Sequence, residues 1–113
     1  MFNEVTTEFD DITREIETVT WDIEKARVSH LLKKAEYENE YSRNIQEEKA
    51  RKGKATQTDL AAFSENQCYQ LRLDLIKAEC DYKSLTNRLK YLRDRFEALK
   101  EKSYNLRKEA GLR

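Results

Sequence analysis

The segment Arg51-Lys52-Gly53-Lys54-Ala55-Thr56-Gln57-Thr58-Asp59 decides the fold, because it separates two long stretches with the same apolar periodicity. In both stretches apolar residues recur at alternating steps of three and four. A strand cannot use a period of 3.5 residues, so both stretches are predicted helices. The first seam consists of Phe2, Val5, Phe9, Ile12, Ile16, Val19, Ile23, Ala26, His30, Lys33 and Tyr37. The second seam consists of Cys68, Leu71, Leu75, Ala78, Tyr82, Leu85, Leu89, Leu92, Phe96, Leu99, Ser103, Leu106 and Ala110.

The segment between the seams has the residues of a helix end followed by a helix start. Gly53 can end a helix in the left-handed conformation. Thr56 followed by Asp59 resembles a capping box, and Thr58 is a competing N-cap. We therefore expect one domain over residues 1–113, with helix one at about 5–50, a basic turn at about 51–56 and helix two at about 57–109.

The two seams match each other when the chain folds back at residue 54. The antiparallel alignment pairs Phe9 with Leu99, Ile12 with Phe96, Ile16 with Leu92, Val19 with Leu89, Ile23 with Leu85, Ala26 with Tyr82 and His30 with Ala78. The midpoint of this alignment lies beside Gly53, so the matching of the seams and the helix-ending glycine independently indicate the same turn. The predicted fold is all-α: an antiparallel two-helix coiled-coil hairpin.

The composition fits this fold and excludes others. The chain has 113 residues, of which 39% are charged, with no proline and two glycines. A β-sandwich, a barrel or a doubly wound sheet needs many more turns. No apolar run approaches the length of a membrane span, and the acidic start MFNEVTTEFDD lacks a signal-peptide pattern, so a cytoplasmic protein without membrane contact is expected.

The hairpin would place opposite charges side by side. Residues 1–24 contain eight acidic residues and one basic residue, whereas residues 83–113 contain ten basic and four acidic residues. Flanking charges of opposite sign select partner and orientation in coiled coils. The basic arm has two interpretations: it neutralises the acidic arm, or it is a free surface for nucleic acid.

Apolar residues that lie off the two seams form what we call the belt. In the predicted alignment they lie level with one another near the middle of the hairpin. Two helices cannot enclose two apolar surfaces, so the belt predicts a homo-oligomer interface; the alternative is that helix one bends and covers part of it. The belt consists of Trp21, Val28, Leu31, Leu32, Ala35, Tyr69, Leu73, Ile76 and Cys80.

Nothing in the sequence indicates catalysis or a cofactor. There is no glycine-rich phosphate loop, no nucleophile motif and no metal-ligand spacing. Cys68 and Cys80 are interpreted as reduced thiols that serve as small apolar residues. His30 lies on the first seam and is interpreted as a partly buried polar residue that fixes the alignment.

The most informative surface is what we call the tip cluster, which consists of Arg43, Lys49, Arg51, Lys52 and Lys54. It faces no acidic segment, and a cationic turn on a helical hairpin can bind phosphates. A solvated turn is the other interpretation. Tyr37, Tyr41 and Phe63 lie next to the cluster; they either belong to the core or stack against bases.

The stretch from Ile23 to Gly111, with its basic turn and the ending YKSLTNRLKYLRDRFEALKEKSYNLRKEAG, resembles small helical-hairpin proteins of bacteriophages, and among them the UvsY-type recombination mediators. Lys49-Ala50-Arg51 followed by Gly53 is similar to the basic segment through which that family binds single-stranded DNA. The resemblance implies an oligomer that helps to load a recombinase onto DNA coated by single-strand-binding protein, with Lys49 and Arg51 as phosphate contacts. Lys52 departs from the family pattern, and the tyrosines that follow the segment are absent.

The leading hypothesis is a non-enzymatic, oligomeric single-stranded DNA-binding accessory protein of recombination or replication. The alternative is a coiled-coil protein-interaction module, such as a scaffold, a chaperone or an inhibitor of a host factor, which binds a partner through the belt. The formal net charge of zero favours the alternative slightly, since nucleic-acid-binding proteins usually carry excess positive charge.

Overall fold

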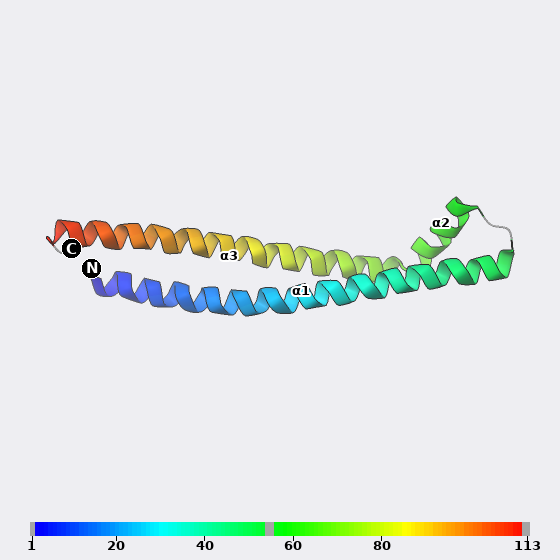
Figure 1. Cartoon of the computed structure of the whole chain (residues 1–113), viewed down its shortest axis with the longest axis horizontal. Coiled ribbons are helices and arrows are strands. Elements are labelled where there is room, and N and C mark those ends of the chain that lie inside the picture. The colour runs from blue at the N-terminus through cyan, green and yellow to red at the C-terminus, as the bar shows by residue number, and fades with distance from the viewer. Residues whose placement is uncertain (1, 54–55, 112–113) are drawn as a thin grey trace. The chain divides into compact units, whose positions relative to one another are not determined.

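The computed structural model describes residues 2–53 and 56–111; for Phe2 and Lys52 it describes only the backbone. Every regular element among these residues is an α-helix: α1 (Phe2–Lys52), α2 (Gln57–Gln67) and α3 (Tyr69–Glu109). Figure 1 shows the three helices in chain order from blue to red. The predicted all-α class is confirmed.

The chain divides into two compact units, each of which is described by itself. Unit 1 consists of Met1–Lys25 and Lys83–Arg113, so that it contains the start of α1 and most of α3. Unit 2 consists of Ala26–Tyr82 and contains the rest of α1, all of α2 and the start of α3.

In unit 1 the two helical segments run in opposite directions along each other (Figure 1). The rings of Phe9 and Phe96 meet edge to face, with centroids 5.3 Å apart. Further along α1, the Glu15 carboxylate accepts a hydrogen bond of 2.7 Å from Arg88, which comes earlier in α3. In the predicted alignment Phe9 and Phe96 belong to neighbouring core layers, so this contact is compatible with that alignment.

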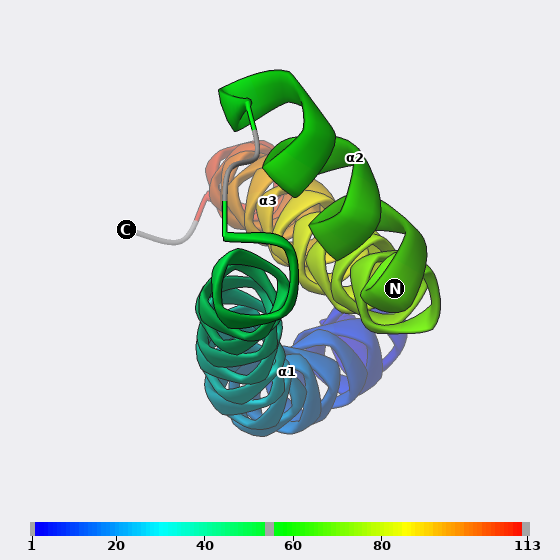
Figure 2. The same ribbon diagram turned by 90° about the vertical axis from the view of Figure 1, so that its right-hand side faces the viewer.

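In unit 2, α1 contacts both α3 and α2. The rings of His30 and Tyr82 are stacked, with centroids 6.2 Å apart and planes inclined by 12°. Nearer the turn, Asn44 of α1 donates a hydrogen bond to the sulfur of Cys68. Figure 2 shows α2 inclined to the axis of α1.

The two predicted seams form the core. Each described side chain on them is buried or half-buried, with Ala110 as the exception. The most deeply buried apolar residues of unit 1 are Val5, Ile12, Leu92 and Leu99. Burial follows the heptad pattern because only positions three or four residues apart share one face of a helix.

The predicted caps around the turn are also confirmed. Gly53 has a φ of +72°, and its N–H donates to the Lys49 carbonyl at 2.9 Å, which closes α1 in the left-handed conformation. Thr56 is the N-cap of α2, because its hydroxyl accepts a hydrogen bond of 3.1 Å from the Asp59 N–H. The competing candidate, Thr58, lies inside the helix.

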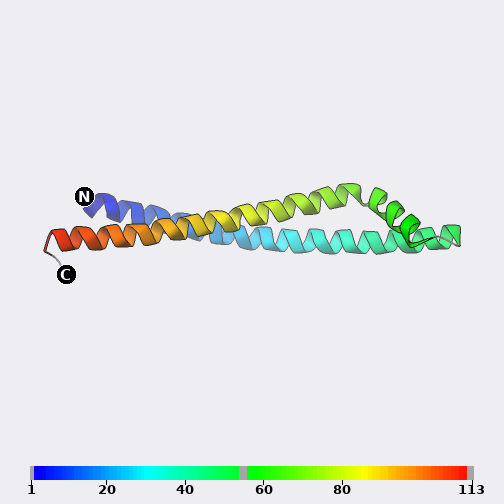
Figure 3. The same ribbon diagram turned by 90° about the horizontal axis from the view of Figure 1, so that it is seen from above.

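Helix two was expected to be continuous over about 57–109, and this prediction is wrong at one residue. Cys68, with φ −99° and ψ 11°, separates α2 from α3 (Figure 3). The buried positions Leu60, Ser64 and Cys68 are spaced by two successive steps of four, which interrupts the heptad. Two successive steps of four depart from the alternating steps of three and four, and such a departure locally changes the supercoiling of the helices. The break at Cys68 accommodates this change.

Candidate nucleic-acid interface

The tip cluster lies mostly in the last turns of α1, where its positive charges complement the negative end of the helix dipole. Lys49 is exposed and has no ion pair within the described part of the chain. For Lys52 the side chain is not described, and Lys54 lies outside the described residues.

Arg51 is held by a buried carboxylate one turn earlier in α1. Its Nε and Nη2 donate to the two oxygens of Glu48 at 3.0–3.3 Å. Glu48 is only 2% exposed, whereas the Arg51 side chain is 67% exposed. The Arg51 guanidinium carbon also lies 6.0 Å from the centroid of the Phe63 ring. These contacts fix the guanidinium at the surface, although its charge is partly neutralised.

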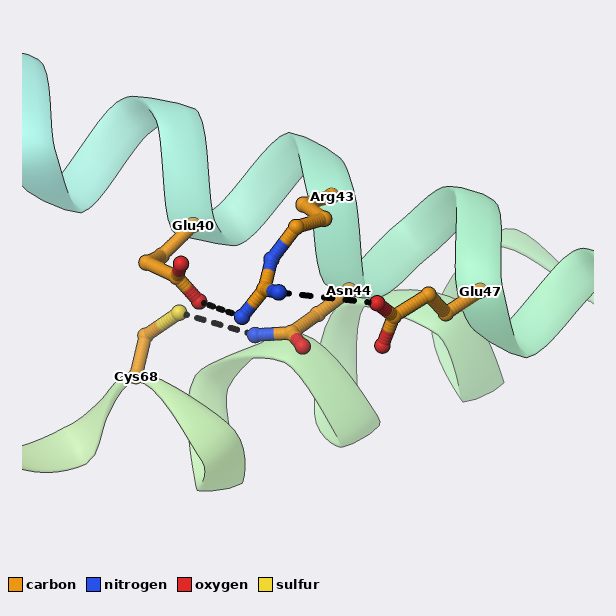
Figure 4. Close-up of polar contacts among 5 residues, drawn as sticks. All are labelled: Glu40, Arg43, Asn44, Glu47 and Cys68. Carbon is orange, nitrogen blue, oxygen red and sulfur yellow. Dashed lines mark hydrogen bonds and ion pairs between the residues drawn. The ribbon is translucent and has the colours of Figure 1, made fainter.

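Arg43 is engaged by two glutamates of the same helix (Figure 4). It donates a hydrogen bond of 2.6 Å to Glu40 and lies 3.8 Å from Glu47. The hydrogen bond to Glu40, followed by the charges of Glu40 and Glu47, raises the pKa of Arg43. Arg43 is therefore less available for a phosphate than the sequence suggested.

Beneath the tip cluster lies a polar core that the sequence reasoning missed. Asn44, Glu48 and Ser64 are buried, and the Asn44 amide lies 3.3 Å from the Cys68 sulfur (Figure 4). The Ser64 hydroxyl has no hydrogen-bond partner among the described residues. The signal was present, because steps of four, three and four from Tyr37 reach Asn44 and Glu48.

The three aromatic residues near the cluster belong to the core side of unit 2. Tyr37, Tyr41 and Phe63 are all half-buried, and the rings of Tyr37 and Tyr41 lie 5.9 Å apart. The shallow hollow beside the two tyrosines, about 240 Å³ in volume, is also lined by Glu38 and Glu65. Carboxylates repel a phosphate backbone, so this hollow does not favour base stacking on the tyrosines.

All nine belt residues are exposed to solvent. Trp21 is the most exposed of the large apolar ones, with 72% of its surface accessible. Helix one therefore does not cover them, which removes that alternative. In unit 2 the belt falls into two stripes, one on each long helix. The α1 stripe is Val28, Leu31, Leu32 and Ala35, and the α3 stripe is Tyr69, Leu73, Ile76 and Cys80. By helical position each stripe points away from the seam of its own helix.

The histidine and the two cysteines have no neighbours that would form a metal site among the described residues. His30 is half-buried against Tyr82, Cys68 is buried and Cys80 is exposed, and both cysteines are free. The described residues contain no group of histidine, cysteine and carboxylate side chains that could hold a metal ion. Nor does any described helix combine the length and apolar character needed to cross a bilayer.

Comparison with known proteins gives no further assignment: no family model, curated protein or solved structure matches this chain.

Proposed function

We propose that this chain is a non-enzymatic, oligomeric, single-stranded DNA-binding accessory protein of recombination or replication, built on an antiparallel coiled-coil hairpin. The observation that carries the proposal is the run Lys49-Ala50-Arg51-Lys52-Gly53-Lys54, which has four cations and no acidic residue at the end of a helical hairpin. A single strand is flexible enough to bring successive phosphates to such a turn.

The contacts of Arg51 support this role. Glu48 engages Nε and Nη2, which leaves Nη1 without a partner among the described residues. An arginine that is already oriented loses less side-chain freedom on binding a phosphate. Lys49, one turn from the end of α1, adds an exposed ammonium group on another face of the same helix.

The belt supports the oligomeric part. Its two stripes point away from the core on different helices, so a neighbour that covers one stripe leaves the other open. A hairpin with two such surfaces would contact two neighbours, and each tip would be repeated within the assembly. Linking several weak sites raises the overall affinity by about 10²–10⁴-fold, which suits an accessory protein with modest individual sites.

The DNA-binding proposal is tested by fluorescence anisotropy with a labelled oligo-dT across a salt series. Replacing Lys49, Arg51, Lys52 and Lys54 with alanine should weaken binding and flatten the log–log salt slope, by about 0.7 for each phosphate that is no longer neutralised. A matched control removes four exposed cations elsewhere in the chain: Lys25, Lys34, Arg72 and Lys77. Equal effects of the two quadruple variants would contradict the assignment to the tip.

The oligomer is tested by sedimentation velocity at micromolar concentration. Leu32→Glu combined with Ile76→Glu places a charge in each stripe and should convert the assembly to smaller species. Ser29→Glu combined with Asn66→Glu adds the same charge at exposed polar positions and should not. A wild-type chain that sediments as a monomer would refute this part of the proposal.

One observation favours the alternative, a protein-interaction module. Arg43 and Arg51 are both bound to carboxylates, whereas large apolar side chains of the belt are open to solvent. In that case a partner helix would cover a stripe. Failure of wild-type protein to bind oligo-dT at low salt, together with a belt-dependent complex with a helical partner, would favour this second function.

A further inference from the structure

The two lateral edges of unit 1 differ in charge. On α3, basic residues recur every seven positions on both sides of the seam. Arg88, Arg95 and Lys102 form one row, and Arg93, Lys100 and Arg107 form the other. Since seven residues are close to two helical turns, each row stays on one side of the seam over its whole length.

The facing rows of α1 are not equivalent. On one side of the α1 seam lie Glu8, Glu15 and Asp22, and on the other lie Thr6, Thr13 and Thr20. In an antiparallel helix pair, the row that runs along one side of the seam on the first helix faces the row with the same heptad position on the second helix. Glu15 immediately precedes the seam residue Ile16, and Arg88 immediately precedes the seam residue Leu89, so the two have the same heptad position. The contact of 2.7 Å between Glu15 and Arg88 joins two such residues and fixes which rows meet.

It follows that the acidic row of α1 faces Arg88, Arg95 and Lys102, and we call this side the neutral edge. The threonine row faces Arg93, Lys100 and Arg107, and we call that side the cationic edge. Directly facing carboxylates are therefore present on one edge only, while on the other edge Asp10, Glu17 and Glu24 lie one row further out on α1. The two interpretations of the basic arm, internal neutralisation and a free binding surface, apply to different edges of the same unit.

The side chains of the cationic edge are available. Arg93, Lys100 and Arg107 are exposed, and neither arginine has an ion pair within the part of the chain that the structure describes. Lys100 lies 3.6 Å from Glu97 of the same helix, with both side chains more than half exposed. The facing threonines are exposed and carry no charge.

An exposed aromatic residue lies on the same side. Tyr104 is four residues after Lys100 and three before Arg107, and 65% of its surface is accessible. Residues at these spacings are neighbours on a helix surface. Basic side chains interleaved with an exposed ring are typical of surfaces that bind a phosphate backbone and stack a base. An acidic protein helix would pair its carboxylates with the basic residues but would have no base to stack on the tyrosine ring.

We propose that the cationic edge of unit 1 binds single-stranded DNA, with Arg93, Lys100 and Arg107 on the phosphates and Tyr104 stacked on a base. This inference rests on the proposed function and adds a second contact surface, remote in sequence from the tip cluster. The strand would lie along the cationic edge, where the basic row of α3 faces the threonine row of α1. Arginine is suited to this role because its planar fork donates two parallel hydrogen bonds to a phosphate.

Two matched triple variants test the edge by oligo-dT anisotropy over about 50–200 mM salt. Arg93→Gln, Lys100→Gln and Arg107→Gln should flatten the salt slope by about 2, which is 0.7 for each of three contacts. Arg88→Gln, Arg95→Gln and Lys102→Gln remove the same charge from the neutral edge and should leave the slope unchanged. Equal slopes in the two variants would overturn the inference.

A substitution on the facing helix tests the same edge without changing α3. Thr13→Glu combined with Thr20→Glu would give the cationic edge the acidic partners that the neutral edge already has. This variant should bind oligo-dT more weakly because the added carboxylates face the basic row of α3, and it should stay helical because the higher helix propensity of glutamate offsets the repulsion from Asp10, Glu17 and Glu24. Unchanged DNA binding by this variant, with its helix content retained in circular dichroism, would overturn the inference even if the triple variant failed to fold.

Tyrosine substitutions test whether the cationic edge binds DNA or an acidic protein. Tyr104→Ala should weaken oligo-dT binding by about 5- to 100-fold. The control Tyr91→Ala removes a ring that is half exposed and lies 5.4 Å from Arg88, on the side of the neutral edge, and it should have little effect. Tighter binding of poly-glutamate than of oligo-dT, insensitive to Tyr104, would overturn the inference in favour of an acidic protein.

The outcomes also distinguish the two levels of the proposal. Wild-type protein that does not bind oligo-dT even at low salt would refute both the proposed function and the edge. Wild-type protein that binds, with affinity abolished in the tip variant but retained in the cationic-edge variant, would refute the edge alone.

Discussion

Replacing Leu92 with alanine should lower the free energy of unfolding by about 2–3 kcal/mol. Leu92 has no accessible surface, and it packs in the core of unit 1. Truncation of a buried leucine costs about 2–5 kcal/mol, through the transfer free energy of the removed atoms and the cavity that remains. The lower part of this range applies because a core between two helices is thin and can partly collapse into the gap.

The neighbouring residue provides the control. Tyr91 is half exposed, and its ring lies 5.4 Å from the Arg88 guanidinium. Tyr91→Ala removes this cation–π interaction, worth about 0.5–1 kcal/mol at an exposed site, and adds a similar amount of helix propensity. The two substitutions therefore differ by about 2 kcal/mol although the residues are adjacent in the chain.

Thermal unfolding followed by circular dichroism measures the difference. A chain of this size has an unfolding entropy of about 0.24 kcal/mol/K, so Leu92→Ala should lower the midpoint by about 10 °C and Tyr91→Ala by only a few degrees. The samples should be compared at equal protein concentration, since association would stabilise the folded state. Equal midpoints for the two variants would show that the seam does not pack as described.

Three further predictions concern the thiols, the turn and the ion pair. Exposed Cys80 should react rapidly with a thiol reagent in the native protein, whereas buried Cys68 should react only when the protein opens or unfolds. Equal reaction rates of the two thiols would contradict the contact between α1 and the start of α3. Gly53→Ala should destabilise by about 1 kcal/mol through backbone strain alone, because its φ is +72° and no atom lies within 4 Å of the added methyl group; an unchanged urea midpoint would argue against the left-handed cap. In a double-mutant cycle, Glu15 and Arg88 should show a coupling of about 0.2–1 kcal/mol that salt weakens, and zero coupling at low salt would remove the contact that distinguishes the two edges.

Much of the fold follows from periodicity. The steps of three and four from Val5 to Tyr37 and from Cys68 to Leu106 predict which residues are buried, because helix geometry alone puts such positions on one face. The caps at Gly53 and Thr56 are equally local, since they depend on the conformational freedom of one residue and on one side-chain hydrogen bond.

The tip was predicted less well, for an electrostatic reason. Counting cations treats Arg43 and Arg51 alike as free charges, whereas each is paired with a glutamate three residues earlier. The burial of Glu48 depends on the packing of unit 2 around it. The break at Cys68 follows from the two steps of four between Leu60, Ser64 and Cys68, and only the structure shows that these three positions are the buried ones.

The amino-acid sequence alone determined the helices apart from the break at Cys68, the caps at the turn and the apolar buried faces, because these depend on interactions within a turn or two of helix. Only the tertiary structure decided that Glu48 is buried against Arg51 and that Glu15 of α1 pairs with Arg88 of α3. The reason is that salt screens Coulomb interactions between exposed side chains beyond about 10 Å, so pairing depends on which rows of the two helices face each other.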